Sequence, residues 1–498
     1  MKAARYYGPG DIKVEQIAEP EARAGQVKVK IAWNGICGSD LHAYLAQITK
    51  FPTLTEPNDL SGETLPITLG HEFSGTIVGI GDGVEGKFKL GQNVVIEPVV
   101  SCRKPECYSC SHGATNVCPS TNFIGIGGWG GGLSEYIAVD ANLVHILPEN
   151  VSLEIGAMIE PLAVAWHAMK RGNFQDGQSA LILGAGPIGL FLLTILRAFG
   201  PTSTIVVSEP AQIRRNLASK HGATLVLDPL NPNNPVDAAV LKATNGVGVD
   251  VAFDATGVQA AVDTALLSVR PHGTFVNIAI WEQRPSLDMN LVVFREITVT
   301  GSAVYRGHHP ELLEAVASGK LHGLDDLITR KIALENVVDQ GFKALINEKD
   351  KQSIHYIQEV DYRSGVLTDW AVPLRDLATS KYEATLAFDP LNPVKSIVAA
   401  LMKATKGVGI DIAFDIQAAV DPALMNVRPH DTNLRYEFGR LVRDYGFGQC
   451  CVLTSDSDHV GLLEAVAAGK LQGLEDVVDK GIKALINKKD KQLEIMQY

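Results

Sequence analysis

The chain has 498 residues, more than one hydrophobic core normally supports, and this length predicts about three domains. Hydrophobic residues make up 46% and charged residues 20% of it, as in ordinary soluble globular proteins. The formal net charge of −12 argues against nucleic acid or an anionic membrane as a partner. The first segment, MKAARYYGPGDIKVEQI, alternates like a strand and lacks the apolar core of a signal peptide, so we expect a cytoplasmic protein.

Candidate metal ligands follow in three separate segments. Cys37 lies in GICGSDLH, His71 and Glu72 lie in GHEFSG, and Glu160 lies in IEPLAVAWHA. A lone cysteine or histidine is usually a core residue, but these two stand in glycine-flanked segments beside further polar groups. Cys37, His71 and Glu160 could together hold a zinc ion and leave a fourth position open, as a catalytic zinc site requires.

Four of the seven cysteines are concentrated in the segment CRKPECYSCSHGATNVC. They are Cys102, Cys107, Cys110 and Cys118. In a long chain without an export signal, such clustering indicates a metal site rather than disulfides. Four thiolates complete a tetrahedral shell and leave no position for a substrate, so this pattern predicts a structural zinc site.

A dinucleotide-binding pattern begins at residue 180. A short apolar strand at 180–183 precedes GAGPIG, and an apolar helical pattern then runs to about Phe199. The longest uncharged run, residues 179–196, reaches the length of a membrane span, but its glycines and proline mark a strand that turns into a helix. The candidate cofactor-binding residues are Gly184, Gly186, Pro187, Ile188, Gly189, Glu209, Arg214 and Thr256.

Glu209 ends the next predicted strand, TIVVSEP, 20 residues beyond Gly189. Its carboxylate is placed to accept hydrogen bonds from the adenosine ribose and to repel a 2′-phosphate, which favours NAD over NADP. Arg214 and Arg215 leave the alternative open, because an arginine beyond this strand can bind a phosphate, flank the adenine or face solvent. Further strands at 249–257 and 273–281 fit a doubly wound α/β sheet.

The carboxyl-terminal part repeats an earlier part of the chain. KATNGVGVDVAFD at 242–254 returns as KATKGVGIDIAFD at 403–415, and the spacing between matching segments falls from 161 to 140 residues along the repeat. The copy lacks the glycine loop and every candidate metal ligand, and it has lost the Thr256–Gly257 turn. We therefore expect residues 361–498 to be a degenerate duplicate without an active site, either a regulatory module or a misjoined reading frame.

These motifs resemble the zinc-dependent medium-chain dehydrogenases, and among them the (R,R)-butanediol dehydrogenases. GHEFSGTIVGIGDGV is similar to the family's zinc signature, and TEPNDLSGETLPITLGHEFSG, SEPAQIRR and NIAIW carry the likeness to the butanediol enzymes. The resemblance covers about residues 1–360. The sequence departs from the family where four residues, rather than two, separate Cys102 from Cys107, and where GQNVV replaces Gly-Asp-Arg-Val.

The resemblance implies a GroES-like β-rich catalytic domain at 1–159, completed by 296–360, and a Rossmann domain with a doubly wound parallel sheet at 160–295. The degenerate α/β repeat at 361–498 would follow. It also implies NAD and two zinc ions per chain. One zinc is catalytic and is bound by Cys37, His71 and Glu160, with Glu72 adjacent and exchanging with water or substrate. The other is structural and is bound by the four clustered cysteines. Ser39 and His42 occupy the positions of the family's proton relay.

The implied reaction is hydride transfer between NAD and a vicinal diol or hydroxyketone, with 2,3-butanediol and acetoin as the best candidates. The alternatives are a sorbitol-like polyol dehydrogenase, another secondary alcohol dehydrogenase, and a non-catalytic NAD-binding protein disabled by its tail. The family commonly forms dimers or tetramers, so we expect a homo-oligomer. Residues 296–304, EITVTGSAV, are the candidate edge strand for pairing between subunits.

Overall fold

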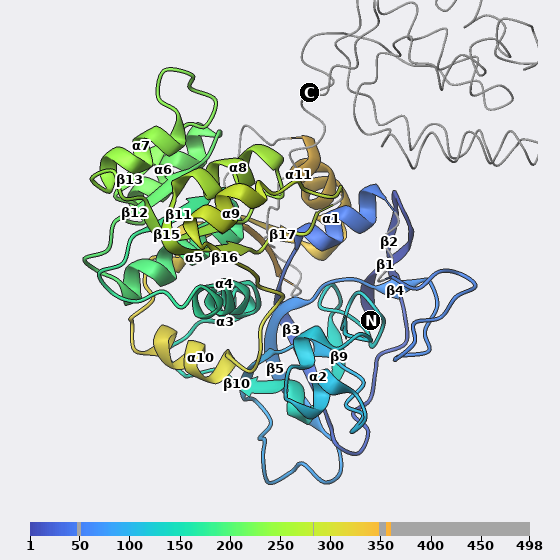
Figure 1. Cartoon of the computed structure of the whole chain (residues 1–498). Helices are drawn as coiled ribbons and strands as arrows, with labels where there is room; N and C mark the ends of the chain where they lie inside the picture. Colours follow the sequence, from blue (N-terminus) through green and yellow to red (C-terminus); the bar gives the residue numbers. More distant parts are fainter. Residues whose placement is uncertain (47–50, 282, 348–354, 360–498) are drawn as a thin grey trace, which may run out of the picture. The chain divides into compact units, whose positions relative to one another are not determined.

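The computed structural model describes residues 1–46, 51–281, 283–347 and 355–359 (Figure 1). The predicted duplicate at residues 361–498 lies outside these described residues. Within them, no helix is both long enough and apolar enough to cross a membrane. The apolar run at 179–196 is divided between a strand and a helix, as its glycines and proline predict.

Antiparallel strands dominate the amino-terminal part of the chain. These strands are β1 (Lys2–Gly8), β2 (Asp11–Gln16), β3 (Gln26–Gly35), β4 (Ile67–Thr68), β5 (Glu72–Ile80), β6 (Asn93–Ile96), β7 (Val99–Val100), β8 (Asn122–Phe123), β9 (Tyr136–Asp140) and β10 (Val144–Ile146). β1 pairs with β2 and β4 in a small sheet, and β7 pairs with β8. The other strands form a larger sheet that is completed by β17 (Ile328–Ala333) and β18 (His355–Glu359).

β3 holds this larger sheet together. It pairs with β5 along one side, and along the other side it pairs first with β9 and then with β18. Val27, Val29 and Ile31 alternate along β3 and are fully buried, because alternate residues of a strand point to the same face. Since β18 comes from the far end of the described chain, the sheet joins segments that are distant in sequence.

The second main sheet has six parallel strands in the spatial order β13-β12-β11-β14-β15-β16. They are β11 (Ala180–Leu183), β12 (Ile205–Ser208), β13 (Leu225–Leu227), β14 (Val249–Asp254), β15 (Val269–Asn277) and β16 (Thr298–Gly301). This order is that of the doubly wound dinucleotide-binding fold, so the predicted doubly wound parallel sheet is confirmed. The edge strand β16 carries the sheet past residue 295, where the sequence prediction ended the Rossmann domain.

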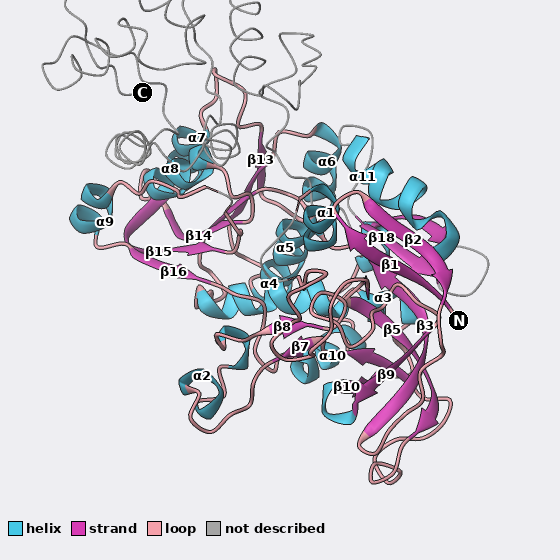
Figure 2. Ribbon diagram, turned by 90° about the vertical axis from the view of Figure 1, so that its right-hand side faces the viewer, coloured by secondary structure: helices cyan, strands magenta, loops and turns pink. Residues whose placement is uncertain are grey.

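Helices cover both faces of the parallel sheet (Figure 2). The helices are α1 (Gly38–Leu45), α2 (Tyr108–Ser111), α3 (Leu153–Ala157), α4 (Ile159–Arg171), α5 (Pro187–Phe199), α6 (Gln212–Lys220), α7 (Val236–Ala243), α8 (Gln259–Ser268), α9 (Met289–Arg295), α10 (His309–Ala317) and α11 (Lys343–Asn347), with short 3₁₀ or π turns at Thr115–Val117, Ala141–Leu143, Leu324–Leu327, Leu334–Asn336 and Val337–Phe342. Ala180 and Ile182 share a core with α4 and α5, whereas Leu181 and Leu183 share a core with α7 and α8. A strand buried on both faces must be apolar throughout, as β11 is.

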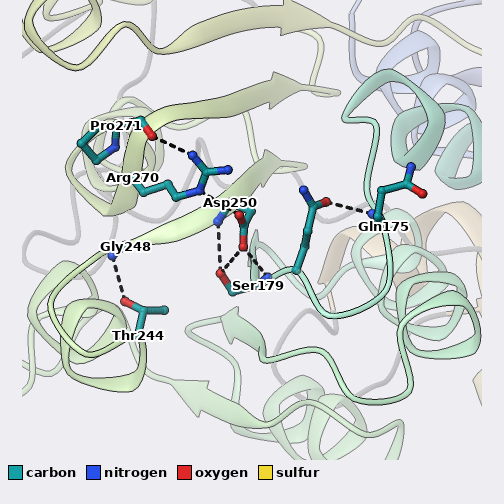
Figure 3. Close-up of polar contacts among 8 residues, drawn as sticks. Gln175, Ser179, Thr244, Gly248, Asp250, Arg270 and Pro271 are labelled. Carbon is teal, nitrogen blue, oxygen red and sulfur yellow. Dashed lines mark hydrogen bonds and ion pairs between the residues drawn. The ribbon is translucent and has the colours of Figure 1, made fainter.

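A polar network closes the amino end of the parallel sheet (Figure 3). Asp250 Oδ2 accepts hydrogen bonds from the backbone N–H and the hydroxyl of Ser179, at 2.7 and 2.8 Å. Asp250 Oδ1 accepts one from Arg270 Nε at 2.8 Å. Burial raises the pKa of Asp250, but these hydrogen bonds outweigh it and hold the pKa below its ordinary value. The carboxylate therefore ties together the starts of β11, β14 and β15.

Candidate active site and metal centres

The four clustered cysteines lie together between β7 and β8. Their sulfur atoms are all within 4.8 Å of one another, with separations of 3.8 Å for Cys102–Cys110, 3.8 Å for Cys107–Cys118 and 3.5 Å for Cys102–Cys118. A tetrahedral zinc ion with Zn–S bonds of about 2.3 Å holds its sulfurs about 3.8 Å apart. The four sulfurs therefore fit one zinc ion with a closed shell.

The longer spacing between Cys102 and Cys107 folds as a turn. Arg103 has a positive φ of 50°, and the backbone N–H of Cys107 donates to the carbonyl of Lys104 at 3.1 Å. Cys107 then precedes the short helix α2, which carries Cys110. The additional residues thus leave the sulfur atoms in a compact group, and this departure from the family spacing does not disturb the cluster.

Cys37, His71 and Glu72 form a second cluster, with one ligand atom of each within 4.8 Å of the others. Cys37 caps α1 after β3, and His71 immediately precedes β5. The pairing of β3 with β5 places these segments side by side. Gly70 lies in this approach, because it has a φ of 97° and a Cβ there would lie 2.7 Å from Oδ1 of Asn34 in β3. All three candidate ligands are buried.

Two residues of α1 contact the imidazole of His71. Ser39 Oγ lies 3.1 Å from Nε2, and Asp40 Oδ1 lies 3.6 Å from Nδ1. A carboxylate bonded to one ring nitrogen orients a metal-binding histidine and leaves the other nitrogen for the metal. Asp40 is beside Nδ1 without a hydrogen bond to it, so a small movement would give it this role. Asp40 is fully buried, and its Oδ2 accepts the backbone N–H of Cys37 at 3.0 Å. Asp40 was not among the residues predicted from sequence, although its place three residues after Cys37 is a signal that could have found it.

Glu160 lies in the first turn of α4 and is 4% exposed. It is near enough to raise the pKa of the Cys37 thiol, but it stands outside the group of side chains within 4.8 Å. The hydroxyl of Tyr305, another residue absent from the sequence predictions, interacts with the Glu160 carboxyl and opposes the effect of burial on its pKa. The structure thus brings Glu72 into the close group with Glu160 nearby, and the predicted ligand role of Glu160 stays a prediction.

Burial drives the ionisable groups of this region toward their neutral forms. It raises the pKa of Glu160 to about 8 and that of Asp40 to about 7. Burial, together with the nearby carboxylates, also raises the pKa of Cys37 well above its ordinary value, and burial lowers that of His71 to about 4. Neutral imidazole is the metal-binding form, and a divalent cation would favour the charged forms of the acidic groups. The donor set therefore fits a zinc ion.

The glycine loop between β11 and α5 has the geometry of a pyrophosphate-binding turn. A Cβ at Gly189 would lie 1.9 Å from the carbonyl oxygen of Gly184, so α5 can pack against the loop only with glycine there. A Cβ at Gly186 would meet nothing within 4 Å, and Pro187 and Ile188 begin the helix after it. A phosphate at this open position would face the first N–H groups of a helix.

Glu209 lies at the end of β12, directly beside this loop. Its Oε2 accepts the backbone N–H of Ala185 at 2.8 Å, and its Oε1 accepts that of Ala211 at 2.9 Å. Arg214 is buried in α6. Arg215 donates to the carbonyl of Glu209 at 2.8 Å, and one of its terminal nitrogens lies 3.2 Å from Asp228. The carboxylate is therefore held in place at the predicted cofactor position, while Arg215 is engaged with neighbouring protein groups.

Thr256 also lies at the loop. A Cβ on Gly184 would be 2.7 Å from Thr256 Cγ2, and the Thr256 hydroxyl donates to Asp254 Oδ1 at 2.6 Å. Ser39 and His42 are three residues apart on α1, so they share one face of this helix. The structure thus brings Thr256 to the glycine loop and places Ser39 against His71, with His42 one turn beyond.

Two family models match the chain over these regions. The alcohol dehydrogenase GroES-like domain matches residues 23–149, and the zinc-binding dehydrogenase domain matches residues 187–318. The chain belongs to the zinc-dependent medium-chain alcohol dehydrogenases, which are NAD(P)-linked oxidoreductases with a catalytic Cys/His/Glu site and a structural four-cysteine site. The predictions of the family, the enzyme class, zinc with a nicotinamide dinucleotide, and the GroES-like fold are confirmed.

Within this family the chain is similar to (R,R)-butanediol dehydrogenases. It is 39% identical over 351 residues to the enzyme of Neisseria gonorrhoeae, and this alignment covers 70% of this chain and 97% of the relative. It is 40% identical over 354 residues to the Bacillus subtilis enzyme, covering 71% and 99%. The crystal structure of 2R,3R-butanediol dehydrogenase from Bacillus subtilis aligns with a TM-score of 0.67 and covers 72% of this chain and 99% of that one.

Proposed function

We propose that the protein oxidises a vicinal diol to a hydroxyketone with NAD, and that 2,3-butanediol and acetoin are its substrate pair. One observation carries this proposal: the buried group of Cys37, His71 and Glu72 lies in a chain that is 40% identical to a butanediol dehydrogenase over 99% of that protein. A metal site with a carboxylate is harder than one with two thiolates, which suits a substrate with two oxygens. A cytoplasmic location is part of this proposal.

We assign the catalytic zinc to Cys37, His71 and Glu160, with Glu72 close enough to exchange with a ligand. The structural zinc is assigned to the four clustered cysteines. Zinc at the first site supplies a Lewis acid that lowers the pKa of a substrate hydroxyl. Asp40 orients the imidazole of His71.

Ser39 is the proposed first acceptor of the substrate proton. Its hydroxyl lies 3.1 Å from His71 Nε2, at the border of the ligand group. Ser39 would accept the substrate proton and give up its own, and His42, one turn further along α1, would be the final proton acceptor. Histidine side chains generally titrate near neutral pH, which suits the last position of a relay. A bound nicotinamide would supply the hydride acceptor, so the proton and the hydride would leave to separate acceptors.

NAD rather than NADP is the proposed cofactor. Two backbone N–H groups hold the carboxylate of Glu209 beside the glycine loop. A carboxylate at this position accepts hydrogen bonds from the ribose diol and repels a 2′-phosphate. Arg214, buried in the helix that follows β12, is proposed to border the adenine side of the cofactor site.

We also propose a homo-oligomer, a dimer or tetramer, that pairs parallel sheets through β16. This strand lies at the edge of its sheet, and Val293 and Phe294 of the preceding helix α9 are 62% and 84% exposed. An edge strand beside exposed apolar side chains is suited to pairing with a second copy. Sedimentation of the purified protein should give a dimer or tetramer, and a monomer at micromolar concentration would contradict the proposal.

A substrate and cofactor panel tests the proposed reaction. Purified full-length protein should contain zinc and form NADH most efficiently with 2,3-butanediol, whereas a higher kcat/KM with sorbitol would assign the polyol alternative. NAD binding without turnover on any alcohol would support a non-catalytic protein. A version that ends at Val360 should keep its activity and bind one NAD per chain, as the full chain should. Loss of a second NAD equivalent on truncation would show that the duplicate holds a site.

A further inference from the structure

A third group of metal-ligating side chains lies apart from both proposed zinc sites. Glu97 follows β6, His145 lies in β10, and His309 begins α10, and one ligand atom of each lies within 4.8 Å of the others. Figure 1 shows β10 and α10 as neighbours, although more than 160 residues separate them in sequence. We propose that these three side chains form a further binding site for a divalent transition metal ion, with zinc as the first candidate.

The distances between the ligand atoms suit such an ion. His145 Nε2 lies 2.9 Å from Glu97 Oε2, and His309 Nδ1 lies 3.5 Å from the same oxygen. A tetrahedral zinc ion with bonds of about 2.0–2.1 Å holds nitrogen and oxygen ligands about 3.3 Å apart. The two observed separations lie on either side of this value. His145 Nε2 and Glu97 Oε2 share a hydrogen bond in this structure, so a bound metal ion would replace the proton between them, with small side-chain movements completing the coordination.

His309 points to a ligand independently of these distances. Its ring is completely buried, and neither ring nitrogen makes a hydrogen bond to any residue in the described part of the chain. A buried polar group without a partner costs about 1–3 kcal/mol. Burial also lowers the pKa of His309 to about 3, so the ring is neutral and can donate a lone pair. A metal ion at Nδ1 would supply a partner for this nitrogen.

Glu97 brings negative charge to the site. Its Oε2 atom lies 2.9 Å from His145 Nε2 and 3.5 Å from His309 Nδ1, so one carboxylate oxygen faces both histidines. Two histidines and one carboxylate form a donor set that binds zinc, and the same set also suits other first-row metals.

Solvent can reach the proposed site through a groove. The side chains of Glu97 and His145 are 20% and 19% exposed. His145 lines a groove of about 540 Å³, which is also bordered by Lys87, Phe88 and Pro310. A metal ion could enter on this side, and water from the groove could fill the fourth coordination position. The site is thus accessible to added metal in the folded protein.

An ion here would connect α10 to the antiparallel domain and, through Tyr305, to the proposed catalytic zinc site. The ring of Tyr305 packs edge-on against His309 with centroids 5.0 Å apart. Its hydroxyl interacts with the carboxyl of Glu160. Because His309 packs against Tyr305, metal binding at His309 would also restrict the ring of Tyr305. The third site is therefore a stabilising site.

Zinc stoichiometry tests the proposal. After equilibrium dialysis against zinc with a weak chelator, which removes loosely bound surface zinc, we expect three zinc ions per full-length chain. Glu97→Gln and His145→Gln should each bind two, and His322→Gln, an exposed histidine elsewhere, should bind three. His145→Gln at the groove should fold even if Glu97→Gln does not. Two zinc ions in the wild-type protein, or three in His145→Gln, would overturn the proposal.

Cobalt(II) separates this site from the two sites that contain cysteine. Cobalt bound to thiolates gives a charge-transfer absorption, whereas cobalt on two histidines and a carboxylate does not. The third equivalent should therefore raise the thermal stability without adding charge-transfer intensity, and His145→Gln should abolish this increment. If the catalytic assignment were wrong, Cys37→Ala would leave the charge-transfer spectrum unchanged, while the third equivalent would still bind. A third equivalent with thiolate absorption would contradict the proposal.

Discussion

The two cysteine-containing clusters place the same residue type in opposite surroundings. The four clustered cysteines come from one loop, and three of them are partly exposed. Cys37 is buried and shares its surroundings with His71, Glu72 and Asp40. The loop cluster needs only a turn and one short helix, whereas the buried cluster exists only when β3, β5 and α1 have come together.

This difference separates the stabilising role from the catalytic one. A closed shell of four thiolates more than balances the charge of its zinc ion and offers a substrate no coordination position. The buried cluster instead combines donors of different kinds, and burial penalises their charged forms until a cation is present. Loss of the loop cluster should therefore weaken the fold, while loss of the buried cluster should remove the chemistry.

Replacing Cys37 is expected to have the largest effect. Cys37→Ala removes a ligand of the proposed catalytic zinc, so kcat/KM for 2,3-butanediol should fall by at least about 1,000-fold, since the Lewis acid contributes several kcal/mol. NAD binding should change little because the glycine loop is a separate element. Steady-state kinetics, zinc analysis and NAD titration measure these effects, and substantial activity with the zinc still bound would remove Cys37 from the ligand set.

Replacing Cys110 tests the other half of the comparison. Cys110→Ala opens the four-thiolate shell, so the protein should lose one zinc ion and its Tm should drop by at least about 5 °C, since 1 kcal/mol shifts the Tm of a domain of this size by about 2–4 °C. The kcat of the remaining folded protein should stay within about threefold of the wild-type value. Thermal melting with zinc analysis checks the first expectation. A kcat loss as large as that of Cys37→Ala would erase the distinction between the clusters.

The glycine loop with Glu209 is a binding site without metal, and it can be compared with the two cysteine-containing clusters. Changing Glu209, Pro210 and Ala211 to Ser, Arg and Ser removes the carboxylate at the loop and supplies a cation for a 2′-phosphate. The ratio of kcat/KM for NADP to that for NAD should rise by about 100-fold, equivalent to about 2.7 kcal/mol. Kinetics with both cofactors measures this ratio. An unchanged ratio would place Glu209 outside the ribose site.

The network at the opposite end of the same sheet should affect stability alone (Figure 3). Asp250→Asn weakens the hydrogen bonds to Ser179 and Arg270, so the free energy of unfolding should fall by about 1–2 kcal/mol, with kcat unchanged. Because folding lowers the pKa of Asp250, its contribution is present above the unfolded-state pKa and is lost as the pH falls through the folded-state pKa. Urea unfolding at neutral pH and below pH 4 should show the two proteins converging in acid, and a constant difference would contradict this role.

Local patterns were sufficient to predict the elements that depend on neighbouring residues. The apolar run before GAGPIG forms β11, and the helical pattern after it forms α5. The four closely spaced cysteines form the compact loop cluster. The position of Asp40, three residues after Cys37, was a signal in the sequence, but its role also depends on the approach of His71 from the segment that precedes β5. A sequence pattern cannot measure such an approach.

The third ligand group shows the same limit over a longer range. Glu97 and His145 each stand alone in the sequence, His309 follows His308, and nothing in the spacing of the three connects them. They meet because β10 pairs with β6 and because α10 returns from the parallel sheet to the antiparallel domain. Only the tertiary fold brings such side chains together, whereas the four-cysteine loop could be identified from spacing alone.

The late position of β18 in the chain has a consequence for biosynthesis. The last part of β3, Trp33–Gly35, which leads directly into Cys37, pairs on one side with residues 357–359. A ribosome adds about 5–20 residues per second, so the roughly 320 residues between these strands take roughly 16–64 s to synthesise. During that interval this edge of β3 cannot have its native partner, and nascent chains are exposed to mispairing. Newly made protein should therefore depend on chaperones more than a chain whose sheet is completed early.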